Sequence, residues 1–239
     1  MSSPDTPLGS QAGSPVQAAV FDLDGTLVLS EERNRLVWEA FFRGYGIELD
    51  DALLRHITGR RGRDSLAEIL HWFPERTLPE LGAEIAAYES TLDLPAPEPV
   101  PGAVELVRSV AAAGVPIALV TSAGRAAAES ALIALGVREH FHTVIAADDV
   151  ERGKPDPQGY LTACDRLGAA PALTVGFEDT PAGVEALRSA GMSCVGVMTS
   201  YSAAVLAAAD LVVGDLSEVR WHPADRGRNM KAPKGDKGG

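Results

Sequence analysis

The stretch that decides the fold is Ala18-Ala-Val-Phe-Asp22-Leu-Asp24-Gly25-Thr26-Leu-Val28, an apolar run that ends in two carboxylates. Residues 18–21 are apolar without alternation, which is typical of a short parallel strand buried on both faces. Such strands end at the crevice where open α/β sheets bind ligands, so Asp22 and Asp24 fall at the chemically useful edge. The two acids can face the same side, and Gly25 permits a sharp turn close to a ligand. A simpler interpretation is that Asp-Gly only makes a turn after the strand.

The length and net charge of the chain limit the number of domains and the kinds of partner that we expect. The chain has 239 residues, enough for one core with a smaller inserted module. Its 33 acidic residues outnumber its 21 basic ones, for a net charge of −12. Such a chain repels nucleic-acid phosphates and anionic membranes, so we expect no nucleic-acid partner and no membrane partner. If the substrate is itself an anion, a metal ion or a placed lysine must supply positive charge locally.

The two ends of the chain predict no structure. Residues 1–15 are rich in Ser, Pro and Gly and lack the apolar run of a signal peptide, so we expect a disordered leader and a cytoplasmic protein. Residues 223–239 read as a solvated, disordered basic tail.

The pattern between the ends predicts two domains. Residues 30–99 form a helical block, with helices expected from Ser30 onward and over 51–57, 64–71 and 80–92, and it ends in a proline-rich connector. From residue 102, helices and strands alternate. The expected helices are 103–113, 125–135, 157–167, 181–190 and 203–208, and the expected strands are 116–120, 143–146, 173–177, 193–197 and 210–213. The fold class is therefore α/β, a doubly wound parallel sheet (16–29 and 100–222) with an inserted all-helical cap domain (30–99).

Polar groups follow three more of the predicted strands or begin the next helix. Thr121 and Ser122 follow one apolar strand, Lys154 stands in Gly-Lys-Pro-Asp-Pro before a helix, and Glu178 and Asp179 end another strand. Each has a structural explanation of its own, as a helix cap or a loop charge. Their occurrence together with Asp22 and Asp24 at strand ends of one α/β domain favours a shared site.

With these motifs the sequence resembles the haloacid-dehalogenase-like (HAD) hydrolases, specifically the cap-bearing branch of sugar phosphatases and β-phosphoglucomutase-like enzymes. The resemblance covers residues 16 to about 221, with the motifs in the right order. Leu29 departs from it, because this branch often has an aspartate there. The resemblance implies a Mg²⁺-dependent phosphoric monoester hydrolase.

The resemblance also implies a role for each motif residue. Asp22 would be the nucleophile that forms an aspartyl-phosphate, and Asp24 the acid and base that protonates the leaving oxygen and then activates water. Lys154 would offset negative charge, and Thr121 and Ser122 would bind the phosphoryl group. Mg²⁺ would be held by Asp22, the Asp24 backbone carbonyl and Asp179, with Glu178 either a weaker ligand or an acid behind the ligands.

Substrate selection is expected to fall to the cap. The loop at residues 58–65 carries Arg60, Arg61 and Arg63, which could grip a sugar hydroxyl or a second phosphate, or could be solvated helix-start charges. His56, just before this loop, is expected to be structural, and His140 and His142 lack partners for a metal site.

Three functions remain to be weighed. We expect a phosphatase that acts on a small phosphorylated metabolite, a sugar or polyol phosphate, as a monomer or weak homodimer. The second candidate is a sugar-phosphate mutase, which would carry a cap histidine where this chain has Asn34. The third is a non-catalytic interaction module on the same fold. A dehalogenase is disfavoured because it would not keep an acid at the position of Asp24.

Overall fold

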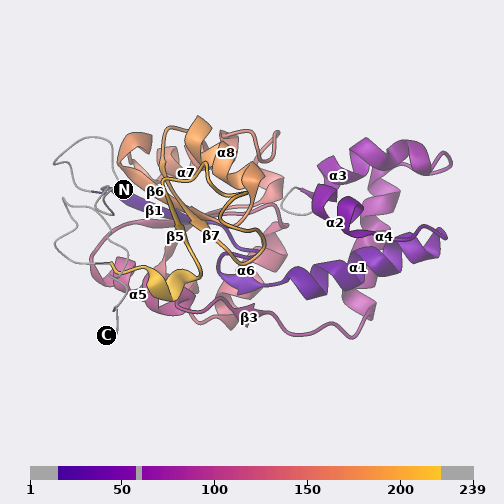
Figure 1. Ribbon diagram of the computed structural model, residues 1–239, viewed down its shortest axis with the longest axis horizontal. Coiled ribbons are helices and arrows are strands. Elements are labelled where there is room, and N and C mark those ends of the chain that lie inside the picture. Colours follow the sequence, from indigo (N-terminus) through magenta and orange to yellow (C-terminus); the bar gives the residue numbers. More distant parts are fainter. Residues whose placement is uncertain (1–15, 58–60, 222–239) are drawn as a thin grey trace.

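The computed structural model describes residues 16–57 and 61–221, and its core is a parallel sheet of six strands. The strands follow the order β5-β4-β1-β6-β7-β8, so the first strand lies at the centre (Figure 1). They are β1 (Ala18–Phe21), β4 (Ile117–Val120), β5 (Phe141–Ile145), β6 (Thr174–Glu178), β7 (Ser193–Val197) and β8 (Leu211–Val213). Every pairing in this sheet is parallel. The predicted doubly wound α/β sheet is confirmed.

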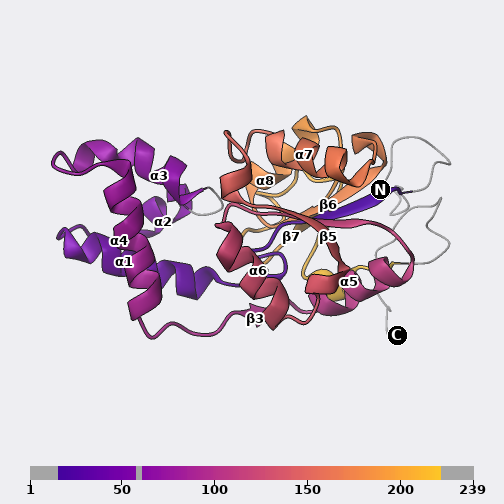
Figure 2. The same ribbon diagram turned by 180° about the vertical axis from the view of Figure 1, so that it is seen from behind.

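The central strand is buried on both faces because helices cover the sheet on each side. Phe21 packs in one hydrophobic cluster with α5 (Ala103–Ala112) and α6 (Arg125–Ala134). Val20, its neighbour in the strand, packs in a second cluster with α7 (Gln158–Leu167) and α8 (Pro181–Ser189). Figures 1 and 2 show these two helix pairs on opposite sides of the sheet. The stretch 18–21 is apolar throughout because neither of its faces meets water.

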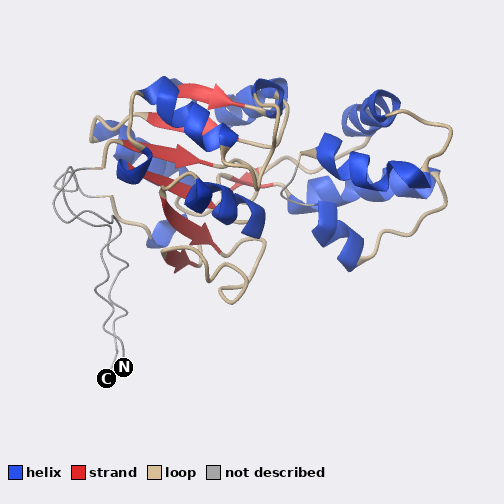
Figure 3. Cartoon of the chain, turned by 90° about the horizontal axis from the view of Figure 1, so that it is seen from above, coloured by secondary structure: helices blue, strands red, loops and turns tan. Residues whose placement is uncertain are grey.

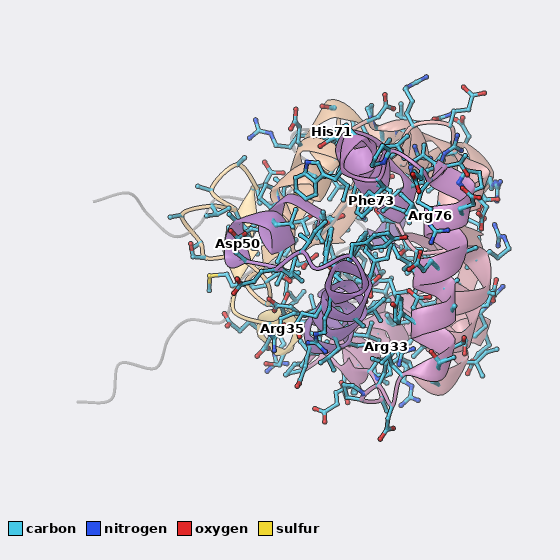
Figure 4. The ribbon with its side chains drawn as sticks, turned by 90° about the vertical axis from the view of Figure 1, so that its right-hand side faces the viewer. Arg33, Arg35, Asp50, His71, Phe73 and Arg76 are labelled. Carbon is cyan, nitrogen blue, oxygen red and sulfur yellow. The ribbon has the colours of Figure 1, made fainter. Side chains whose placement is uncertain are left out.

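The helical cap is a separate body beside the carboxyl ends of the strands (Figure 3). Its helices are α1 (Glu31–Gly44), α2 (Asp51–Ile57), α3 (Gly62–Ile69) and α4 (Leu78–Thr91). They enclose their own apolar cluster, in which Phe41, Phe42 and Phe73 are buried. Figure 4 looks at the cap from outside, with Phe73 between the helices and charged side chains such as Arg35 and Arg76 around it. The cap therefore has a small core of its own.

Two short strands join the cap to the core. β2 (Val28–Leu29) leaves the core and β3 (Glu98–Pro99) returns to it, and they pair antiparallel with Val28 opposite Pro99 and Leu29 opposite Glu98. The proline-rich stretch predicts an extended connector but not this pairing, which joins segments about 70 residues apart in the chain.

The predicted helix at 203–208 is wrong. This alanine-rich segment forms successive turns that end in β8. Leu206 is fully buried, and Leu206 and Ala209 approach Gly196 of β7 so closely that an added Cβ there would lie 3.2 Å from the Ala209 Cβ. Six residues are too few to offset the cost of helix nucleation, so packing against β7 decides the local structure.

The remaining differences are small. The strand expected at 143–146 begins earlier, at Phe141, and the helix expected at 64–71 begins at Gly62 and ends at Ile69. Short 3-10 turns occur at Leu70–Trp72, Arg138–His140, Ala147–Asp149, Pro171–Leu173 and Leu216–Glu218. Within the described ranges, no helix is long and apolar enough to cross a membrane. The predicted leader and tail lie outside the described residues.

Candidate active site

Asp22 stands at the carboxyl end of the central strand and is almost completely buried. Its Oδ1 accepts a hydrogen bond of 2.5 Å from the Lys154 ammonium. Burial raises the pKa of Asp22 from 3.8 to about 7, with Lys154 opposing the rise and Glu178 and Asp24 adding to it. The fold therefore holds this carboxylate where its charge is costly without further positive charge nearby.

Lys154 and Glu178 form the buried ion pair behind Asp22. Lys154 comes from the segment before α7, and its Nζ donates to Asp22, to the Val120 carbonyl at 3.3 Å and to Glu178 Oε1. Burial alone would lower the pKa of Lys154, but Asp22 and Glu178 raise it above its usual value. The lysine is therefore charged at neutral pH, as an anionic reaction centre requires.

Glu178 has its two carboxylate oxygens fully engaged. Besides Lys154, its Oε1 accepts from the Tyr160 hydroxyl at 2.7 Å. Its Oε2 accepts from the backbone N–H groups of Asp179 and Thr180 and from the Thr180 hydroxyl. Glu178 therefore lies within the acidic cluster and also anchors Lys154 and the turn that leads into α8.

Asp179 presents an oxygen without a hydrogen-bonding partner. Its Oδ2 accepts from Ser200 Oγ at 2.5 Å, while its buried Oδ1 has no partner among the described residues. One oxygen each of Asp22, Glu178 and Asp179 lie within 4.8 Å of one another. Burial raises the pKa of Asp179 well above its usual value, with Glu178 and Asp22 adding to the rise. An orphan carboxylate oxygen among three acids suits a hard divalent cation.

Gly25 allows this cluster to form. It has φ +78°, and an added Cβ would lie 2.0 Å from Asp179 Oδ2 and 2.8 Å from Ser200 Oγ. Thr199 also donates to the Gly25 carbonyl. No motif in the sequence marks Ser200, which is 21 residues from Asp179 in the chain.

Asp24 is held apart from the other acids. Its Oδ1 accepts a hydrogen bond from Ser30, whose Oγ in turn accepts from Asn34 Nδ2 at 3.4 Å. Asp24 is half-buried and lines the cavity, whereas Asp22 is deeply buried. The two carboxylates of the opening motif thus have different surroundings, as two different roles would require.

The hydroxyl groups after β4 lie beside the lysine. Thr121 is buried, and its Oγ1 accepts from the Ala123 N–H at 3.0 Å, which leaves its own proton for another acceptor. Ser122 lines the same cavity as Asp22 and Lys154.

A cavity of about 190 Å³ lies in front of these groups, between core and cap. Its cap side combines apolar and polar groups, namely Glu31, Asn34, Val37, Trp38, Ile57, Gly62, Ile85 and Glu89. Leu29, the residue that departs from the family pattern, is exposed and is not part of the lining. Among described lining residues, Lys154 is the only cation.

The predicted cap arginines do not converge on this cavity. Arg61 is buried, but it turns toward the core segment before Lys154 and does not line the cavity. Arg63 is exposed and is also absent from the lining. Arg60 and the side chain of His56 lie outside what the structure describes.

Comparison with known proteins gives the family. The model of the haloacid dehalogenase-like hydrolases matches residues 16–191, so the chain belongs to this family. The chain is 46% identical over 205 residues to validoxylamine A 7'-phosphate phosphatase from Streptomyces hygroscopicus subsp. limoneus, covering 86% of this chain and 96% of that protein. It is 33% identical over 183 residues to fructose-1-phosphate phosphatase YqaB from Escherichia coli K12, covering 74% and 94%. Within the family, the chain is a phosphoric monoester hydrolase.

Solved structures show the same core and cap. A β-phosphoglucomutase from Clostridium difficile superposes with a TM-score of 0.75 at 25% identity, covering 86% of this chain and 94% of that chain. A hydrolase from Pseudomonas syringae gives a TM-score of 0.73 at 26% identity, covering 84% and 94%. The HAD-like fold with a cap, expected from the sequence, is confirmed.

Proposed function

We propose that this chain is a Mg²⁺-dependent phosphatase that hydrolyses the monophosphate ester of a small sugar-like metabolite through an aspartyl-phosphate at Asp22. The observation that carries the proposal is the convergence of Asp22, the Lys154 ammonium and the orphan oxygen of Asp179 at one edge of the sheet. These residues provide a nucleophile (Asp22), a fixed positive charge (Lys154) and a carboxylate oxygen of Asp179 that is free to bind a hard cation.

The residues present fit a magnesium ion. Asp179 Oδ1 is buried without a partner, and Asp22 and Asp179 have raised pKa values because the fold leaves their charges under-compensated. Asp22, the Asp24 carbonyl and Asp179 would hold the ion, and Glu178 would support them from behind, since its oxygens already accept other hydrogen bonds. The ion would supply the positive charge that lets one anion approach another.

The protein's own groups account for both steps. In the first, an Asp22 oxygen bonds to phosphorus while the phosphorus–ester bond breaks, and Asp24 gives its proton to the leaving oxygen. In the second, Asp24 takes a proton from water as the water oxygen bonds to phosphorus and the Asp22–phosphorus bond breaks. Lys154, Thr121 and Ser122 stabilise the phosphoryl oxygens by charge and hydrogen bonds.

The cap side of the cavity favours a leaving group rich in hydroxyl or amino groups. Glu31, Asn34 and Glu89 offer acceptors there, and Trp38 adds apolar surface to the lining. Described lining residues contribute no cation other than Lys154, so a second phosphate would lack a partner among them. The names of the two phosphatase relatives support the same class, since both describe phosphates of small polar compounds.

The test is phosphate release from p-nitrophenyl phosphate and from fructose 1-phosphate, with Mg²⁺ and with EDTA. We expect release only with Mg²⁺, loss in Asp22→Asn, and no loss in Asp165→Asn, a control on the exposed face of α7. Mass spectrometry of acid-quenched protein should place a phosphoryl group on the peptide that contains Asp22. Metal-independent release, or a label on another peptide, would overturn the proposal.

The same assay addresses the mutase. β-Glucose 1-phosphate converted to the 6-phosphate without free phosphate would mean phosphoryl return to the substrate. Asn34 does not provide the imidazole that the resemblance leads us to expect in a mutase, so we expect hydrolysis.

A further inference from the structure

Arg61 is a buried arginine that links the cap to the core. It stands just before α3, is 7% exposed, and is separated by 89 and 90 residues from the two carbonyls that it reaches in the core. Its Nη1 donates to the Val150 carbonyl at 2.9 Å, and its Nη2 donates to the Glu151 carbonyl at 2.8 Å. The guanidinium therefore spans the boundary between the two domains.

The rest of the guanidinium is bound within the cap. Nε donates to Asp64 Oδ2 at 2.7 Å and Nη2 to Asp64 Oδ1 at 2.9 Å, a bidentate pair. Four of the five N–H groups of Arg61 are thus engaged. An arginine paired in this way has little donor capacity left for a phosphate or a sugar hydroxyl.

The core segment that receives these bonds carries the catalytic lysine. Val150 and Glu151 lie four and three residues before Lys154. The N–H groups of Glu151 and Arg152 donate to Gln158 Oε1 at 3.1 and 2.9 Å. The segment is therefore fastened at Arg61 on the cap side and at Gln158 on α7. Lys154 extends from it to Asp22.

Gly153 is in direct contact with this arginine. An added Cβ at Gly153 would lie 2.5 Å from Arg61 Nε and 2.9 Å from Asp64 Oδ2. The residue next to Lys154 thus packs against the Arg61–Asp64 pair without room for a side chain.

We propose that Arg61 is a positioning residue that fastens the cap to the Lys154 segment, so that the lysine takes its place at Asp22 when the cap lies against the core. The proposal rests on the phosphatase function above, because it assigns Lys154 to catalysis. It replaces the expectation that Arg61 grips the substrate.

The test compares Arg61→Gln with Arg43→Gln, which removes the same charge from an exposed position of the cap. With p-nitrophenyl phosphate and fructose 1-phosphate as probes, Arg61→Gln should lower kcat by about tenfold to a hundredfold for both, with KM little changed, because the lysine is misplaced. Arg43→Gln should match the wild type. A raised KM for fructose 1-phosphate with unchanged kinetics on p-nitrophenyl phosphate would make Arg61 a substrate ligand and overturn the proposal.

Gly153→Ala tests the same contact from the core side while Arg61 is retained, so it decides the question if Arg61→Gln does not fold: kcat should fall with KM little changed, and unchanged kinetics would overturn the proposal. Where the Arg61 variants fold, Gly153→Ala should have little further effect in Arg61→Ala, where the crowded Nε is gone. Additive effects would refute the contact as the cause. Wild-type protein that releases no phosphate would sink the phosphatase itself, whereas an active wild type with Arg61→Gln equal to Arg43→Gln would sink only the positioning role.

Discussion

Replacing Lys154 by methionine should remove the one ammonium that the described residues place among the buried acids. The Lys154 side chain is 7% exposed, as is that of Asp22, and the side chain of Glu178 is fully buried. Methionine fills a similar volume but leaves both carboxylates without their counter-charge. Breaking a buried pair from one side costs about 3–5 kcal/mol of unfolding free energy. That is a large part of the roughly 5–15 kcal/mol that holds a typical protein folded.

The assay is urea denaturation at pH 8 in EDTA, alongside phosphate release with Mg²⁺. Lys154→Met should unfold at a much lower urea concentration and lose turnover. The double variant Lys154→Met/Glu178→Gln removes a negative charge as well, so it should regain much of the stability while remaining inactive. The control is Arg152→Gln, two residues before Lys154, which breaks the exposed Arg152–Asp156 pair and should leave the midpoint nearly unchanged.

Two results would refute this reasoning. A Lys154→Met variant as stable as the wild type would mean that the acids do not depend on the ammonium in the metal-free protein. A double variant less stable than the single one would mean that the hydrogen bonds of the ionised Glu178 stabilise the fold by more than its unpaired buried charge destabilises it.

Further predictions concern the acids and their neighbours. Burial raises the pKa of Asp22 to about 7, so its contribution to stability is complete below the unfolded value of 3.8 and is lost as pH rises through about 7. The pKa of Asp179 is also raised, so it acts in the same direction. The melting temperature in EDTA should therefore fall between pH 4 and 8, less so in Asp22→Asn, and a flat profile would contradict this. Asp24→Asn should abolish turnover yet bind Mg²⁺ almost as tightly in calorimetry, because its carbonyl is the expected ligand; a collapse of affinity would disprove that role. Ser200→Ala should weaken Mg²⁺ binding about tenfold by freeing the Asp179 carboxylate, and unchanged affinity would exclude this support. Gly25→Ala should lower stability, since its Cβ would collide with Asp179, and equal melting curves would argue against that crowding.

The sheet can be predicted from the sequence because the signals for its strands and helices are local. Apolar runs such as 18–21 mark strands, and glycines such as Gly168 with φ +63° mark the ends of helices. Neither signal depends on residues elsewhere in the chain. The placement of Asp22, Lys154 and Asp179 at one edge also follows from the sequence, since the carboxyl ends of parallel strands share an edge.

The remaining features depend on contacts between distant segments. The alanine-rich stretch at 203–208 has high helix propensity, but Leu206 must pack on β7, and tertiary contact overrides propensity. Ser200 stands beside Asp179 because the turn after β7 returns over Gly25. Arginine is a common phosphate ligand, so the sequence alone suggests that role for Arg61. Only its hydrogen bonds to carbonyls 89 and 90 residues away show that its guanidinium is engaged elsewhere.

The ladder of β2 and β3 brings the outgoing and incoming connections of the cap side by side. Residues 30–97 therefore leave the core and return to it at one place, where Leu29 and Glu98 are paired neighbours. A tight turn placed between those two residues would close the chain without disturbing any strand of the main sheet. A cap of another size could replace residues 30–97 at this point without breaking the main sheet, but it would need its own residue to fasten the Lys154 segment as Arg61 does.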